Sequence, residues 1–75
     1  MRENSLEYIL QCKNVFRKAY PDERIRLLGY GWLNDDYIII NTYYEGLEQF
    51  YVINNEKVVG CFNTVYEARN SVKWS

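Results

Sequence analysis

The central part of this chain, residues 24–62, is divided into short apolar and aromatic runs by turn-forming residues, and this pattern constrains the fold most strongly. The runs that we interpret as strands are Arg24–Leu33, Tyr37–Tyr44, Gln49–Ile53 and Lys57–Phe62. Each run is rich in the β-branched and aromatic residues that favour strands, and the Asn, Asp, Glu and Gly residues between them favour tight turns. Consecutive strands with such short connections pair most simply with their neighbours, so the pattern predicts a four-stranded antiparallel meander.

A helix is predicted on each side of this strand region. Residues 5–19 carry apolar side chains at helical spacing, and Pro21 ends this helix because the residue before a proline avoids helical backbone angles. Thr64 and Glu67 have the spacing of a capping box, which predicts a second, short helix near the C-terminus. Since 75 residues suffice for one small domain, we expect residues 1–75 to form a single α+β domain with the order α-β-β-β-β-α.

The first hairpin predicts which face of the sheet is covered. If Asn34 and Asp35 form a two-residue loop, strand alternation places Gly29 and Gly31 on one face, opposite isoleucines. Glycine has no side chain and lets a helix approach the backbone closely. We therefore expect this face to be the core and to carry both helices.

The opposite face of the sheet is then open. It presents aromatic residues with two arginines at one end, namely Tyr30, Trp32, Tyr37, Tyr43, Arg24 and Arg26. Exposed patches of this composition are typical of binding surfaces, so we predict that these residues bind a partner. The alternative is that the two faces are inverted, or that a terminal segment covers the patch.

Charge is distributed unevenly along the chain, although the net charge is only −1. Residues 34–56 contain five acidic residues and no Lys or Arg, whereas the segment before them has six basic and four acidic residues and the segment after them three and one. In a meander the first and third turns lie at the same end of the sheet, so Asp35, Asp36 and Glu56 would form an acidic rim. Such a rim beside an aromatic patch suits a basic protein partner. Alternatively, these acids are ordinary solvated turn residues.

Residue types needed for catalysis are missing. The chain has no histidine, so no Ser–His or Cys–His pair can form, and we expect no enzymatic activity. Cys12 and Cys61 form neither a disulfide framework nor a zinc motif, and both are predicted to be buried thiols. Asp35 and Asp36 alone are a weak ligand set for a metal, and the segment Gly29–Gly31 lacks the Lys and Ser or Thr of a phosphate-binding loop. No metal and no cofactor are therefore expected.

The order of elements resembles that of double-stranded-RNA-binding domains, but the basic helix start and loop of that family are missing here. In size, acidity and layout the chain is also similar to small phage-encoded inhibitors of host defence nucleases, although it shares no motif with them. That likeness implies a protein that covers a basic site on a nucleic-acid-handling protein. We predict a non-catalytic protein-binding module of this kind.

Two other functions compete with this prediction. Bases of single-stranded nucleic acid could stack on the aromatic face, but a chain of net charge −1 neutralises phosphates poorly. A homodimer through the same face is the other alternative. No apolar run approaches the roughly 20 residues needed to span a bilayer, and no signal-peptide pattern is visible, so we expect a cytoplasmic protein without membrane association.

Overall fold

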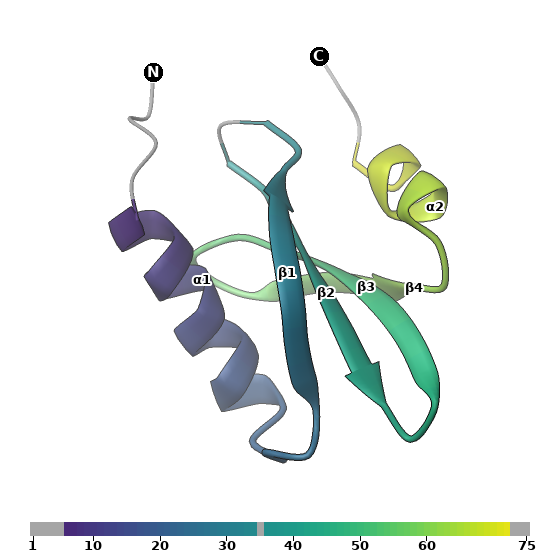
Figure 1. Cartoon of the computed structure of the whole chain (residues 1–75). Coiled ribbons are helices and arrows are strands. Elements are labelled where there is room, and N and C mark those ends of the chain that lie inside the picture. The colour runs from purple at the N-terminus through teal and green to yellow at the C-terminus, as the bar shows by residue number, and fades with distance from the viewer. Residues whose placement is uncertain (1–5, 35, 73–75) are drawn as a thin grey trace.

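The elements follow one another in the predicted order (Figure 1). The computed structural model describes residues 6–34 and 36–72. In these residues the elements are α1 (Leu6–Ala19), β1 (Arg26–Trp32), β2 (Ile38–Tyr44), β3 (Leu47–Ile53), β4 (Val58–Phe62) and α2 (Val65–Asn70). The strands form one antiparallel sheet with the order β1-β2-β3-β4, which confirms the predicted α+β meander. Within the described residues, no helix is long and apolar enough to span a bilayer.

Helix α1 follows the predicted apolar stripe. Tyr8, Cys12 and Phe16 are four residues apart and all buried, so they lie on one face of the helix. The helix ends at Ala19, before Pro21, as predicted. The Arg17 guanidinium then donates hydrogen bonds to the carbonyl oxygens of Asp22 (3.1 Å) and Ile25 (2.8 Å), which ties the end of α1 to the start of β1.

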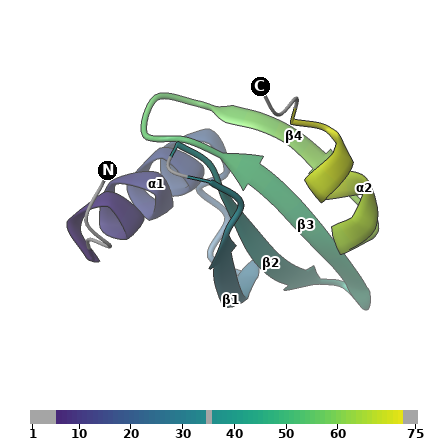
Figure 2. The same ribbon diagram turned by 90° about the horizontal axis from the view of Figure 1, so that it is seen from above.

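The two helices cover opposite faces of the sheet, as Figure 2 shows. The α1 cluster consists of Tyr8, Cys12, Phe16, Ile38, Ile40, Tyr51 and Ile53. The α2 cluster consists of Ile39, Val52, Ala68 and Val72. Alternate residues of the same two strands belong to different clusters, so our prediction that both helices lie on one face is wrong.

The reason lies in the two central strands. Residues 38–40 of β2 and residues 51–53 of β3 are each a run of three consecutive buried residues. Since neighbouring residues in a strand point to opposite faces, both faces of these strands are apolar and each needs a cover. Helix α2 supplies the second cover. It begins as predicted at Thr64, whose hydroxyl accepts a hydrogen bond from the Glu67 amide (3.1 Å).

The first hairpin differs from the prediction in its register. Trp32 pairs with Ile38, so residues 33–37 form the connection instead of a two-residue loop. The Asn34 side-chain oxygen accepts hydrogen bonds from the backbone amides of Asp36 (2.8 Å) and Tyr37 (3.0 Å), which stabilises this longer loop. A bulge at Leu28, between the pairs made by Leu27 and Gly29, adds one residue to β1.

The turn between β2 and β3 is a two-residue turn at Glu45 and Gly46. Both residues have positive φ, 51° and 81° respectively, which is the geometry of a type I′ hairpin turn. Glycine adopts this region readily, whereas a glutamate with a Cβ does so at a cost.

We expect Glu45→Asn to stabilise the fold by up to about 1 kcal/mol, because asparagine tolerates positive φ far better than glutamate. The midpoint of urea unfolding measures this change. Glu45→Ala is the control, since it removes the same charge without easing the backbone and is expected to give no gain. Equal stabilisation by both variants would show that charge, and not backbone geometry, limits this turn.

Candidate interaction surface

Strand β1 lies at one edge of the sheet and, in the described part of the chain, pairs on one side only, with β2. Three of its large apolar side chains are exposed: Leu28 (53%), Tyr30 (47%) and Trp32 (37%). We call these three side chains and the unpaired backbone side of the strand the β1 edge. Exposed apolar side chains on an unpaired strand are a template for association with another chain.

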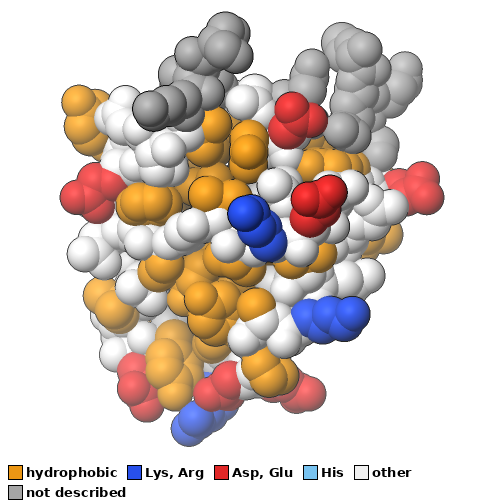
Figure 3. Space-filling view, turned by 180° about the vertical axis from the view of Figure 1, so that it is seen from behind, with side chains coloured by type: hydrophobic (Ala, Val, Ile, Leu, Met, Phe, Trp, Pro, Cys, Tyr) orange, Lys and Arg blue, Asp and Glu red, His pale blue; other side chains and the backbone are white. Residues whose placement is uncertain are grey.

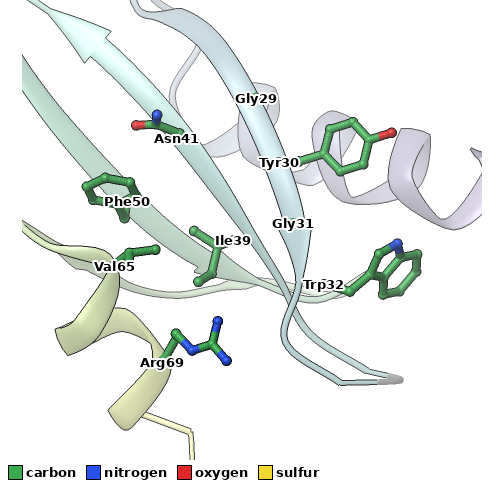
Figure 4. Close-up of a pocket in the computed structure, with 9 residues that line it drawn as sticks. All are labelled: Gly29, Tyr30, Gly31, Trp32, Ile39, Asn41, Phe50, Val65 and Arg69. Carbon is green, nitrogen blue, oxygen red and sulfur yellow. The ribbon is translucent and has the colours of Figure 1, made fainter.

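The two aromatic side chains of the β1 edge are held by α1. The Trp32 ring stacks on the Tyr8 ring with 5.6 Å between centroids and 19° between planes. The Lys13 ammonium lies 5.7 Å from the centroid of the Tyr30 ring, within the range of a cation–π contact. Figure 4 shows both Tyr30 and Trp32 pointing to the α1 side of the strand. Sequence analysis missed Lys13, because its contact with Tyr30 depends on the register of β1.

The backbone amide and carbonyl groups of Tyr30 and Trp32 also point outward from the β1 edge. The Leu33 amide donates to the Tyr37 carbonyl (2.9 Å), so this pair is hydrogen-bonded across the hairpin. Hydrogen-bonded and non-hydrogen-bonded pairs alternate along an antiparallel ladder. The pairs at Gly31 and Gly29 are then hydrogen-bonded, and Tyr30 and Trp32 direct their amide and carbonyl groups away from β2.

The predicted aromatic face is divided between the two sides of the sheet. Because the longer loop shifts the register of the hairpin by one residue, Tyr30 and Trp32 lie with Ile40 and Ile38 on the α1 side. Tyr37 instead packs against the α2 cluster, and Tyr43 is 43% exposed on the α2 side. The single patch predicted from the four aromatic residues is therefore wrong in its geometry.

The two predicted arginines have different surroundings. Arg24 forms an ion pair with Asp22, with 2.9 Å between Nη2 and Oδ2, and its guanidinium lies 5.5 Å from the centroid of the Tyr44 ring. Hydrogen bonds from Arg24 lower the pKa of Asp22 to about 2. Arg26 is exposed and opposes Tyr43 in the register. Only Arg26 therefore lies on the strand with the exposed aromatic residues.

The acidic rim lies partly within the described residues. Asp36 and Glu56 are exposed, in the loops β1–β2 and β3–β4, which the meander places at the same end of the sheet. Asp35, the third predicted member, lies outside the described residues. At the other end, the Glu48 carboxylate accepts a hydrogen bond from the Asn41 amide (2.9 Å).

The glycines of β1 border an open hollow on the α2 side of the sheet (Figure 4). A Cβ built on Gly29 or Gly31 would meet no other described atom within 4 Å, so our prediction that a helix packs over these glycines is wrong. The hollow has a volume of about 320 Å³, and Ile39, Asn41, Phe50, Val65 and Arg69 line it together with residues 29–32. The hollow stays open because glycine has no side chain to fill it and because α2 covers only the neighbouring part of this face.

Cys12 and Cys61 have opposite environments. Cys12 belongs to α1 and is fully buried between the helix and the sheet, as predicted. The prediction that Cys61 is buried is wrong, since Cys61 is exposed on β4, the strand at the opposite edge of the sheet from β1. Tyr51 is the residue that opposes Cys61 in the register. Burial, together with the neighbouring Cys61 thiol, raises the pKa of Tyr51 to about 12.

We expect Cys61 to react with a thiol reagent in seconds to minutes and Cys12 to react only after unfolding, because modification requires access to the sulfur. Titration with Ellman's reagent, with and without denaturant, counts the thiols that react in the native protein and those that react only after unfolding. Cys61→Ser should remove the fast reaction and leave the slow one. Two fast thiols in the native protein would contradict the burial of Cys12.

Within residues 6–34 and 36–72, no three Cys, Asp or Glu side chains come together as a group that could hold a metal ion.

No protein family matches this chain, and no curated protein or solved structure is detectably similar to it. On the side opposite to the view of Figure 1, hydrophobic side chains are also exposed, with charged side chains near them (Figure 3). That side contains the β4 edge, where Val59 is 42% exposed.

Proposed function

We propose that this chain is a non-catalytic protein-binding module and that its contact surface is the β1 edge. The observation that carries the proposal is the combination of exposed Leu28, Tyr30 and Trp32 with outward backbone groups at the same strand. A partner segment that adds as a strand gains main-chain hydrogen bonds, and its side chains gain apolar contacts. Tyrosine and tryptophan are also enriched among residues that contribute most to binding energy.

Charge favours a protein partner over nucleic acid at this edge. Among the basic residues near β1, Arg24 is paired with Asp22, and Arg17 is hydrogen-bonded to two backbone carbonyls. Of the basic residues near β1 in the described part of the chain, Lys13 and Arg26 then remain to neutralise phosphates, and affinity for nucleic acid depends on the number of phosphates neutralised.

The acidic loops, β1–β2 with Asp36 and β3–β4 with Glu56, suggest what kind of protein the partner is. Asp36 lies in the β1–β2 loop, next to the end of β1 that carries Trp32, whereas Glu56 lies in the β3–β4 loop, beside Lys18 and Tyr20 at the C-terminal end of α1. A partner with a basic site beside an extended segment would be complementary to both features. Coverage of such a site on a nucleic-acid-handling protein would make this chain an inhibitor, as we predict from its sequence.

The test compares two charge insertions on exposed tyrosines. Tyr30→Lys places a cation on the β1 edge, whereas Tyr66→Lys places one on α2, where Tyr66 is 75% exposed. Proteins from the source cell are captured on each immobilised variant and on the wild-type chain. We expect a protein that the wild type and Tyr66→Lys retain and Tyr30→Lys loses. Equal retention by both variants would place the contact elsewhere and refute the proposal.

Two further experiments test whether the acidic loops steer the captured partner and whether the chain binds nucleic acid. If the loops steer a basic partner, Asp36→Asn with Glu56→Gln should slow association and flatten its salt dependence, with less effect on dissociation. Unchanged association at low salt would leave these acids as ordinary loop residues. For nucleic acid we expect no binding to single-stranded oligonucleotides at physiological salt. A micromolar complex lost on Lys13→Ala with Arg26→Ala would replace protein binding by nucleic-acid binding.

A further inference from the structure

The β1 edge is complementary to itself when two copies of the strand run antiparallel. We propose that two copies of this chain form a dimer in which β1 pairs with β1 of the partner about a twofold axis at Gly31. This inference rests on the proposed function of the β1 edge as a protein-binding surface, and it names a second copy of the chain as an occupant.

Backbone geometry selects the register. Tyr30 and Trp32 are the residues whose amide and carbonyl groups point away from β2, so they must supply the hydrogen bonds to an added strand. An axis at Gly31 places Tyr30 opposite the partner's Trp32 and Trp32 opposite the partner's Tyr30. Each of these pairs exchanges two hydrogen bonds. The pairing segment also lies entirely on one side of the bulge at Leu28.

Side chains in this register are complementary on the α1 side of the sheet. Residues that face each other across an antiparallel pair lie on the same face, so each Tyr30 ring lies beside the partner's Trp32 ring. Both rings are already partly exposed and already held by α1, through Lys13 and Tyr8 respectively. The dimer would therefore cover exposed aromatic area without ordering long, free side chains.

Charge gives an independent argument for a second copy in the antiparallel direction. Arg26 is the first residue of β1, and exposed Asp36 lies in the loop that follows the strand. Antiparallel pairing brings Arg26 to the end of the partner's β1 where the partner's Asp36 lies. The twofold axis gives two equivalent contacts of this kind. Parallel pairing would bring Arg26 to the partner's Arg26 and Asp36 to the partner's Asp36, which is unfavourable.

The other open edge, β4, fits a closed dimer less well. It has five residues, against seven in β1, and the bulge at Val59, its second residue, leaves three regular residues (60–62), against four (29–32) after the bulge of β1. Pairing of β1 with the partner's β4 would use two different surfaces and would continue into an open assembly. Pairing of β1 with β1 ends at two copies. Because a short strand pair buries less area than the roughly 1,200–2,000 Å² of standard interfaces, we expect dissociation in the micromolar range.

The first measurement is sedimentation of the full chain from low micromolar to near-millimolar concentration. We expect a concentration-dependent monomer–dimer equilibrium for the wild type and for Tyr66→Lys. Tyr30→Lys should remain monomeric across the same range while keeping its native circular dichroism. A wild-type chain that stays monomeric throughout, or that forms species larger than a dimer, would overturn the proposal.

A disulfide tests the register. With an axis at Gly31, the two Gly31 residues form a non-hydrogen-bonded pair, whose Cα atoms lie about 4.5 Å apart, within the range that a disulfide spans. Gly31 has open space at its Cβ, so cysteine fits there. In a Cys61→Ser background, Gly31→Cys should form a covalent dimer at least tenfold faster than Val59→Cys, which places a thiol on the β4 edge. Equal rates would refute the register.

The outcomes separate this inference from the proposed function. A monomeric wild type whose captured partner is lost on Tyr30→Lys would refute the dimer and leave the β1 edge as a protein-binding surface. A monomeric wild type whose captures do not depend on Tyr30→Lys would refute both. A dimer that Tyr30→Lys does not dissociate would refute pairing through β1.

Discussion

Replacement of Phe16 by alanine is expected to remove a large part of the free energy of unfolding. Phe16 is fully buried in the α1 cluster, and its ring lies 4.9 Å from the Tyr51 ring and 5.2 Å from the Tyr20 ring, measured between centroids. A buried Phe→Ala substitution costs about 3–5 kcal/mol. A domain of 75 residues has a total of about 4–11 kcal/mol at the usual stability per residue. The loss is therefore between about a quarter of the total and all of it.

Urea unfolding followed by circular dichroism measures this loss, with Leu10→Ala as the matched control. Leu10 belongs to the same helix but is 57% exposed, so its truncation is expected to cost less than about 0.5 kcal/mol. If both variants lost similar stability, α1 would not dock on the sheet through the Phe16 side.

Replacement of Ile39 by alanine is the second large effect, and it tests the arrangement of helices on opposite faces. Ile39 is 7% exposed and belongs to the α2 cluster with Ala68 and Val72. A buried Ile→Ala substitution costs about 2–5 kcal/mol, because apolar contacts are lost and a cavity remains. If both helices lay on the α1 side, Ile39 would be on an open face and the cost would be small.

Tyr43→Ala is the control for this prediction. Tyr43 lies on the same strand and the same face as Ile39 but is 43% exposed, beyond the part of the face that α2 covers. We expect its loss to change the free energy of unfolding by a fraction of the Ile39→Ala effect. Equal costs, or a larger cost at Tyr43, would contradict the position of α2.

Sequence patterns were sufficient for the elements and their order. The apolar stripe of α1, the cap at Thr64 and the succession of short strands are local features, and each depends on residues close together in the chain. The consecutive apolar residues 38–40 and 51–53 also carried a signal that both sheet faces are covered. Our prediction gave more weight to the glycines of the first hairpin.

The register of β1 could not be obtained in the same way. It depends on the Asn34 side chain capping a five-residue connection and on one extra residue at Leu28, and neither feature changes the apolar pattern of the strand. A shift of one residue exchanges the two faces of a strand. For this reason Tyr30 and Trp32 were correctly predicted to be exposed but were placed on the wrong side of the sheet. Their role in binding stays a prediction.

Hydrogen exchange of individual backbone amides tests most directly whether the β1 edge binds protein by strand addition. In the dilute free chain, the amides of Tyr30 and Trp32 should exchange fast, because they point away from β2, while those of Gly29 and Gly31 are protected by the hairpin. In the complex, with either a second copy or a captured protein, we expect exchange at Tyr30 and Trp32 to slow at least tenfold, with no change at Val59. A complex in which both amides still exchange fast would contradict strand addition at β1.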